Sequence, residues 1–175
     1  MVADYPEGYP FEYLMTFVQD CKDVVSFFSY HQQEKAKLIK LQIAEGKRQL
    51  VQPATTRWGS IINCMRRLRE NESILHRIVS ARDFIVGTLK QRQRRQQIMR
   101  TICDDNFVAY LDKCIEILQP IDMGITLFQG DQVSLSYVYK HFAVTMKRSY
   151  EQMACLSNEE CSYTLNLVKE RLEFM

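Results

Sequence analysis

Glycine, proline and long apolar runs are all scarce in this sequence. Its 175 residues include only 6 glycines and 4 prolines, too few for a collagen-like or loop-rich chain. No apolar run approaches the ~20 residues that a membrane-spanning helix needs. Residues 1–10 are acidic and hold no apolar core, so we expect no signal peptide. These absences predict a soluble protein without a membrane partner.

Motifs for metal binding and catalysis are missing as well. The six cysteines include no C-x2-C pair, and His31, His76 and His141 are scattered along the chain. Without a signal peptide, reduced thiols are favoured over the alternative of three disulfides. The sequence has no G-x-S-x-G, P-loop or H-E-x-x-H motif. We therefore expect no metal, no cofactor and no catalytic site, although Cys–His catalysis stays open.

Adjacent Asp104 and Asp105 are the acids that most suggest a catalytic or metal-binding pair. Metal-dependent chemistry needs carboxylates that converge on one ion. Two neighbouring acids before an apolar helix are instead typical of a helix N-terminus, where negative charge meets the helix dipole. We expect both residues to serve the helix start.

The overall composition is typical of a folded domain. Hydrophobic residues make up 46% of the chain and charged residues 25%, which excludes global disorder. At ~100–200 residues per domain, the length predicts one domain. We expect an N-terminal tail over residues 1–10 and a single helical domain over 11–175.

Apolar residues recur at steps of three and four almost throughout, the period of amphipathic helices. The pattern predicts an all-α fold of about eight helices and no credible set of strands. Two helices are expected over Phe11–Phe28 and from about Gln33 to a cap at Gly46, with an extended connection at 49–54. The later helices are expected to start near Thr55 or Thr56, Arg82, Asp104, Pro120, Asp131 or Ser134, and Ser157.

Two residues are expected to interrupt helices. Asn71 should break the helix that starts near Trp58. Pro120 should end the helix of Phe107–Leu118, because proline lacks the backbone N–H and its ring crowds the preceding turn. Residues from about Arg82 to Ile102 should form one longer helix with a polar middle.

Charge is distributed unevenly along the chain. Residues 47–100 carry 13 Lys or Arg against 3 Asp or Glu, whereas residues 1–46 and 101–175 have net charges of −3 and −5. With so little acid in it, the basic segment 47–100 predicts a surface for a polyanion, DNA in particular. The predicted DNA contacts in this segment include Arg66, Arg67, Lys90, Arg92, Arg94, Arg95 and Arg100.

The string Thr55-Thr56-Arg57-Trp58-Gly59-Ser60 contains the only tryptophan. Arg57 and Trp58 lie at an expected helix start, where free backbone N–H groups favour anions. Both residues are therefore candidate nucleic-acid contacts. The alternative is that Trp58 anchors the core and Arg57 faces solvent.

This string and its surroundings resemble the hAT superfamily of transposases. Residues 53–60 match its P-x-x-T-R-W-x-S segment, and residues 23–31 match the D-V-V-x-F-F-x-x-H helix that precedes this segment. Residues 118–139 contain pieces similar to its L-x-P-I, x-G-D and L-S-x-V-Y stretches. The similarity keeps the family's order and spacing over roughly residues 14–142.

The resemblance implies the helical insertion domain of an RNase H-like transposase without the nuclease. The family's catalytic acids lie in segments that this sequence does not contain. In the family, the pair corresponding to Arg57 and Trp58 is close to the transposon end, where the indole could stack on a displaced base. The implied partners are DNA, non-specific or transposon-end-like, and other transposase-derived chains in the nucleus.

The sequence therefore predicts a DNA-binding helical module with no catalysis of its own. The alternative is a helical protein-interaction or structural module whose basic face is solvated or binds an acidic partner. A third hypothesis, a working transposase, would require acidic residues from another chain.

Overall fold

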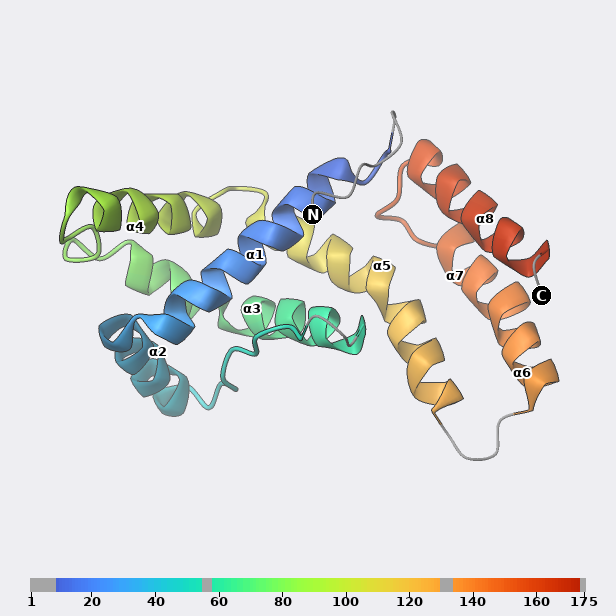
Figure 1. Cartoon of the computed structure of the whole chain (residues 1–175), viewed down its shortest axis with the longest axis horizontal. Coiled ribbons are helices and arrows are strands. Elements are labelled where there is room, and N and C mark those ends of the chain that lie inside the picture. The colour runs from blue at the N-terminus through green and yellow to red at the C-terminus, as the bar shows by residue number, and fades with distance from the viewer. Residues whose placement is uncertain (1–8, 55–57, 130–133, 174–175) are drawn as a thin grey trace. The chain divides into compact units, whose positions relative to one another are not determined.

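The structure is a computed structural model that describes residues 9–54, 58–129 and 134–173 (Figure 1). Over these residues every regular element is a helix, which confirms the predicted all-α fold. The elements are α1 (Glu12–Tyr30), α2 (Gln32–Ala44), α3 (Trp58–Val79), α4 (Leu89–Ile102), α5 (Phe107–Phe128), α6 (Leu135–Lys140), the π-helical turn η1 (His141–Met146), α7 (Lys147–Glu151) and α8 (Asn158–Glu173). Because α6, η1 and α7 follow without a break, they form one helix over residues 135–151.

The contacts divide the chain into two compact units. The basic unit comprises residues 16–112 and contains 17 Lys or Arg and 10 Asp or Glu. The acidic unit comprises residues 1–15 and 113–175 and contains 6 Lys or Arg and 11 Asp or Glu. The boundaries between the units fall inside α1 and α5. The single domain expected over residues 11–175 stays a prediction.

Apolar residues at helical spacing form the core of the basic unit. Its buried members are Phe17, Cys21, Val24, Val25, Phe27, Phe28, Leu38, Ile62, Cys64, Met65, Leu68, Ile74, Leu75, Ile78, Val79, Phe84, Ile98, Ile102, Phe107 and Leu111. Phe17 packs edge-on against Phe107 and Tyr110, with ring centroids 5.8 and 5.4 Å apart. The steps of three and four in the sequence correspond to these buried helix faces.

The predicted cap at Gly46 is confirmed, and a connection follows it as expected. Helix α2 ends at Ala44, and Gly46 has a φ of +64°, in the left-handed region that favours glycine. Residues 47–54 then have no regular structure. This connection leads the chain from α2 to α3.

Asn71 does not break α3, so that prediction is wrong. Its side-chain amide donates hydrogen bonds to the carbonyl oxygens of Arg67 at 2.8 Å and Arg48 at 2.9 Å. Asparagine disfavours helix interiors because its side chain competes for backbone groups. The bond to Arg48 ties the connection 47–54 to the helix, whereas the bond to Arg67 lies within α3, which continues to Val79.

Helix α4 starts at Leu89 and not near Arg82, which corrects the predicted longer helix. Thr88 is its N-cap, and its hydroxyl accepts from the Gln91 N–H while the Thr88 N–H donates to Gln91 Oε1 at 2.9 Å. This capping box has the T-x-x-Q spacing, a signal that the sequence does carry. Residues 80–88 form a loop in which Gly87 has a φ of +103°.

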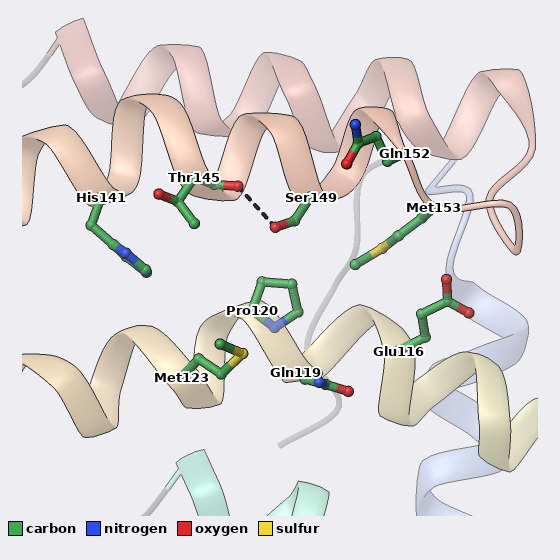
Figure 2. Close-up of a pocket in the computed structure, with 9 residues that line it drawn as sticks. All are labelled: Glu116, Gln119, Pro120, Met123, His141, Thr145, Ser149, Gln152 and Met153. Atoms are coloured by element: carbon green, nitrogen blue, oxygen red, sulfur yellow. Dashed lines mark hydrogen bonds between the residues drawn. The ribbon is translucent and has the colours of Figure 1, made fainter.

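In the acidic unit, α5 continues through Pro120, so the predicted restart at this residue is wrong. Proline removes one backbone donor, but Ile117 and Ile121 on either side of it pack against a core of Met146, Tyr150 and Val168. Tertiary packing thus holds both halves of α5 in one helix. Figure 2 shows this part of α5 facing η1 and α7.

Two predicted caps in the acidic unit are confirmed. Ser134 Oγ accepts from the Tyr137 N–H at the start of α6. Ser157 and Glu160 form a capping box at the start of α8, with each side chain accepting from the other residue's N–H at 3.2 and 2.8 Å. These serines lie at the positions where the sequence placed helix starts.

All six cysteines are free thiols, in agreement with the prediction. Cys21, Cys64 and Cys114 are buried, whereas Cys103 is exposed. Within the part of the chain that the structure describes, no helix has both the length and the hydropathy needed to cross a bilayer.

Candidate nucleic-acid interface

Helix α4 carries the densest positive charge of the basic unit. Its 14 residues include five Lys or Arg and no Asp or Glu. The helix buries Arg95, Ile98 and Ile102, so its opposite side faces solvent. The exposed polar residues of α4 are Lys90, Gln91, Arg92, Gln93, Gln96, Gln97 and Arg100. The predicted contacts on α4 therefore divide into an outward and an inward set.

Arg95 belongs to the inward set, which removes it from the predicted DNA contacts. Its side chain is 11% exposed, and its Nη1 donates to Glu34 Oε1 at 2.6 Å and to the Phe84 carbonyl at 2.9 Å. The guanidinium also lies over the rings of Phe27 and Phe84, 5.8 and 5.5 Å from their centroids. A guanidinium with these partners is unavailable to a phosphate.

Arg94 is also directed toward the protein. Its Nη1 lies 3.0 Å from Asp23 Oδ2 of α1 and 3.0 Å from Gln97 Oε1, and the side chain is 36% exposed. The pair is accessible enough to exchange Asp23 for a phosphate, but the exchange would leave Asp23 next to the phosphate. Arg94 is therefore a weaker candidate for a phosphate contact than the charge count suggests.

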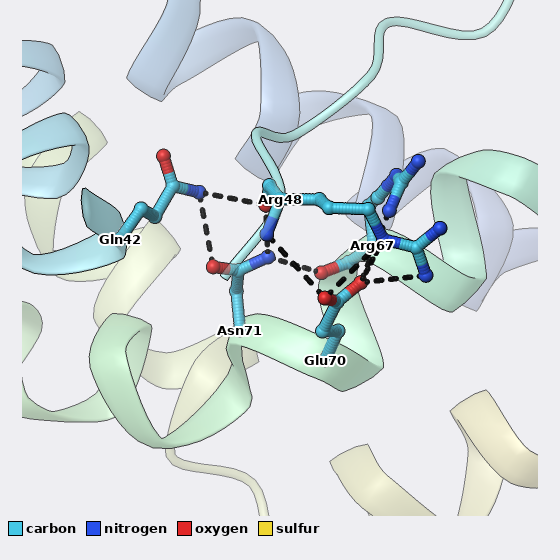
Figure 3. A network of polar contacts seen from close by, with 5 residues as sticks. All are labelled: Gln42, Arg48, Arg67, Glu70 and Asn71. Carbon is cyan, nitrogen blue, oxygen red and sulfur yellow. Dashed lines mark hydrogen bonds and ion pairs between the residues drawn. The ribbon is translucent and has the colours of Figure 1, made fainter. Parts of the chain in front are cut away.

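Arg67, predicted on α3, belongs to a polar network instead of a free surface (Figure 3). Its Nη1 donates to Glu70 Oε2 at 3.1 Å, and the Arg48 side chain donates to the same carboxylate at 3.2 Å. Next to this pair, Gln42 donates to Asn71 Oδ1 at 3.0 Å. The network fastens the connection after α2 to α3, which gives Arg67 a structural role. Arg66 is half-buried.

The electrostatics of Glu70 agree with this pairing. Partial burial by itself raises the pKa of a carboxyl, but hydrogen bonds from the side chain and backbone of Arg48 and from Arg67 outweigh it. The pKa of Glu70 is therefore lowered below its ordinary value. The carboxylate stays ionised at neutral pH and neutralises part of the local positive charge.

Acids from outside the basic segment pair with several of its cations. Asp23 and Glu34 precede the segment and bind Arg94 and Arg95. Glu45 and Asp112 bind Arg77 and Arg69, respectively. Counting charge within a stretch of sequence misses these acids, because they reach the segment only in the folded chain. The accessible positive charge is therefore smaller than the excess of 13 over 3 suggests.

The structure describes only part of the string 55–60 around Trp58. Arg57, Thr55 and Thr56 lie outside the described residues, and Trp58 is the first residue of α3. Ser60 Oγ donates to the Ala54 carbonyl at 2.9 Å, a local bond at this helix start. The roles proposed for Arg57 and Trp58 stay predictions.

Three of the predicted contacts, Lys90, Arg92 and Arg100, are exposed on α4. Lys90 and Arg100 are exposed and form no ion pair with a described residue. Arg92 is exposed and its Nε donates to the Gly87 carbonyl at 2.9 Å, which leaves the terminal nitrogens accessible. Exposed glutamines separate these cations. The arrangement can contact phosphates without competition from a carboxylate on the same helix.

Neither a metal site nor a similar known protein assigns a function to this surface. Across residues 9–54, 58–129 and 134–173, no cluster of three or more His, Cys, Asp or Glu is arranged to hold a metal ion. No protein-family model, curated protein or solved structure matches the chain.

Proposed function

We propose that this protein is a helical nucleic-acid-binding module that contacts phosphates through Lys90, Arg92 and Arg100 of α4. The observation that carries the proposal is the composition of the exposed surface of α4: three exposed cations, exposed glutamines and no carboxylate. The basic unit around it has an excess of seven positive charges. Phosphate contacts of this kind supply affinity and little sequence preference.

The length of α4 and its number of exposed cations determine how tightly we expect the protein to bind DNA. Arg100 lies ten positions after Lys90, so the cations span about 15 Å at 1.5 Å per residue. Three phosphates contacted by three side chains should give a salt dependence of log K with slope about −2.7. Affinity should fall in the range of non-specific binding, with a Kd of ~10⁻⁴–10⁻⁶ M at physiological salt.

The family origin and the absence of catalysis are part of the same proposal. The strings at residues 23–31, 53–60 and 118–139 support an hAT-transposase-like origin. On this reading the protein acts in the nucleus as a non-catalytic relic of the transposase. A duplex with a single-stranded flap should then bind more tightly than a plain duplex, and Trp58→Ala should remove the difference while leaving duplex binding intact.

Fluorescence anisotropy with a labelled duplex of about 20 base pairs, between about 50 and 200 mM salt, tests the α4 contact. The variant K90E/R92E/R100E should lower affinity at least tenfold. The matched control K140E/R148E/K169E makes the same change in net charge at exposed residues of the acidic unit, and should lower affinity far less. Circular dichroism would establish that both variants remain helical.

Two outcomes would reject the proposal. Equal losses in the two variants would assign binding to net charge and not to α4. A wild-type chain that binds no DNA at about 50 mM salt would exclude the function itself.

A protein-interaction module is the second candidate, and α6 favours it. This helix has no buried residue, and it exposes 84% of Leu135, 48% of Tyr137 and 51% of Tyr139. Tyrosine is enriched at protein interfaces because it combines a large apolar ring with a hydroxyl. The two candidates separate in the anisotropy experiment, because only the nucleic-acid module loses DNA binding on charge reversal in α4.

A further inference from the structure

A groove of about 270 Å³ lies in the acidic unit between α5 and the helix 135–151 (Figure 2). Glu116, Pro120 and Met123 line it on the α5 side, and His141, Ser149 and Met153 line it on the other. Figure 2 shows the His141 ring and the Met153 side chain directed across the gap toward α5. The volume is just below the ~300–1,000 Å³ of pockets for drug-sized ligands, so it suits one side chain or a molecule of similar size.

Backbone irregularities occur on both walls of the groove. Pro120 has no N–H, so the Glu116 carbonyl lacks its usual α-helical donor and remains an acceptor beside the groove. On the opposite wall, His141–Met146 form a π-helical turn, a feature often found at functional sites. Two departures from regular helix thus lie on either side of one cavity.

His141 is held in place at this groove. The ring lies close to α5 at Gly124, where a Cβ atom would be 3.4 Å from His141 Nε2, an ordinary van der Waals contact. The ring also packs edge-on against Phe128, with centroids 5.5 Å apart. These contacts keep the imidazole against α5.

The chemistry of the groove favours a positive charge on an apolar stem. Glu116 is exposed, and no Lys or Arg of the described residues lies within ion-pair distance of its carboxylate. Burial and the nearby Glu116 carboxylate raise the pKa of the Cys155 thiol to about 11, and the two carboxylate oxygens have acceptor capacity for further donors. Met123 and Met153 offer polarizable thioethers that pack against alkyl chains. An anion would instead meet the charge of Glu116 in a unit with a net charge of −5.

We propose that this groove binds an aliphatic cation, an ammonium or guanidinium on an alkyl stem. The cationic head contacts the Glu116 carboxylate and the carbonyl oxygen freed by Pro120, and the stem lies over Met123 and Met153. A lysine or arginine side chain of a partner peptide and a free alkylamine share this chemistry. The inference goes beyond nucleic-acid binding and does not depend on it.

Methyl NMR of the full chain labelled at methionine tests the site. Two probes are titrated, agmatine as a free alkylguanidinium and a blocked tri-arginine peptide. Each should shift the methyl signals of Met123 and Met153 saturably, while Met65 and Met99 of the basic unit remain unchanged. Binding of the peptide at least tenfold more tightly than agmatine would identify a partner protein as the source, and equal binding would identify a free amine.

Glu116→Gln is the decisive variant, because it keeps the shape of the side chain and removes its charge. It should weaken both probes at least fivefold, while the control Glu159→Gln, an exposed acid on α8, should leave binding unchanged. The proposal is overturned by any of three results: no saturable shift, unchanged binding in Glu116→Gln, or equal binding of the neutral analogue butylurea.

Discussion

Arg95 and Glu34 form an ion pair inside the basic unit, with 2.6 Å between Nη1 and Oε1, although they are 61 positions apart in the sequence. Arg95 also donates to the carbonyl of Phe84 in the loop 80–88. One guanidinium therefore ties α4 to α2 and to the loop that precedes α4. A residue with the appearance of a DNA contact in the sequence is part of the interior of the fold.

Arg95→Ala should lower the free energy of unfolding by ~3–5 kcal/mol, because it leaves the Glu34 carboxylate buried without a counter-charge. The double variant E34L/R95M should recover most of this loss by replacing both charges with apolar groups. Urea denaturation of the two variants measures the loss and the recovery of the free energy of unfolding. Arg94→Ala is the matched control on the same helix, and its half-exposed pair should be worth only ~0–1 kcal/mol. Equal effects of the two alanine variants would contradict the structural role of Arg95.

Charge reversal at Arg95 should behave differently from charge reversal on the outward side of α4. Arg95→Glu brings a second carboxylate beside Glu34 in the interior, so the variant should lose native structure. K90E/R92E/R100E should keep the helical circular dichroism of the wild type, because these side chains face solvent. If Arg95→Glu unfolds no more readily than the triple variant, the burial of Arg95 is wrong.

Glu160 should contribute to stability at neutral pH and lose that contribution in acid. Its carboxylate accepts from Tyr13 Oη at 2.6 Å, from Lys113 Nζ at 2.8 Å and from the Ser157 N–H at 2.8 Å. Burial by itself raises the pKa of this carboxyl, but the donors outweigh burial, and the pKa is lowered below its ordinary value. Because the unfolded state has the higher pKa, stability is full above about pH 4.5 and falls as pH drops through the folded pKa.

Glu160→Gln tests this linkage through urea denaturation at several pH values. The variant should be less stable than wild type at pH 7, and its stability should change less between pH 5 and pH 3. Glu159→Gln, at the exposed neighbouring position, should keep the wild-type slope. A variant at Glu160 with the wild-type acid dependence would show that other carboxyls, such as Glu70 and Asp83, account for it.

Asn71→Leu should destabilise the basic unit although leucine is the better helix former. Asn71 is fully buried, and Gln42 donates to it at 3.0 Å. Leucine removes the bonds of Asn71 to the Gln42 amide and to the Arg48 carbonyl and leaves these two groups only their mutual 3.3 Å bond, at a cost of ~0.5–1.5 kcal/mol for each hydrogen bond lost. Thermal or urea unfolding measures the loss. A more stable Asn71→Leu variant would mean that helix propensity outweighs the network of Figure 3.

The thiols should differ sharply in reactivity toward iodoacetamide at about pH 8. Burial raises the pKa of Cys64 to about 11 and that of Cys114 to about 12, and the thiolate is the reactive form. Exposed Cys103 should therefore be alkylated first in the native protein, whereas Cys64 and Cys114 should react only after urea unfolding. Mass spectrometry of peptides gives the order. Native labelling of Cys114 as fast as Cys103 would contradict its burial.

The sequence alone determined the features that depend on neighbours in the chain. Steps of three and four among apolar residues predicted the helices and their buried faces, because one turn of helix brings such residues to the same side. The caps at Gly46, Ser134 and Ser157 followed from equally local rules. The capping box of Thr88 and Gln91 follows from the same local rules, although we did not predict it.

Only the tertiary structure decided which residues interrupt a helix and which cations stay accessible to solvent. Asn71 and Pro120 carry strong local signals against a helix, yet hydrogen bonds to a distant segment and packing of both flanks keep α3 and α5 continuous. Asp23 and Glu34 turn Arg94 and Arg95 away from the outward side of α4. Ion pairs form between side chains that are close in space, and their separation along the chain leaves no signal in the local sequence from which to predict them.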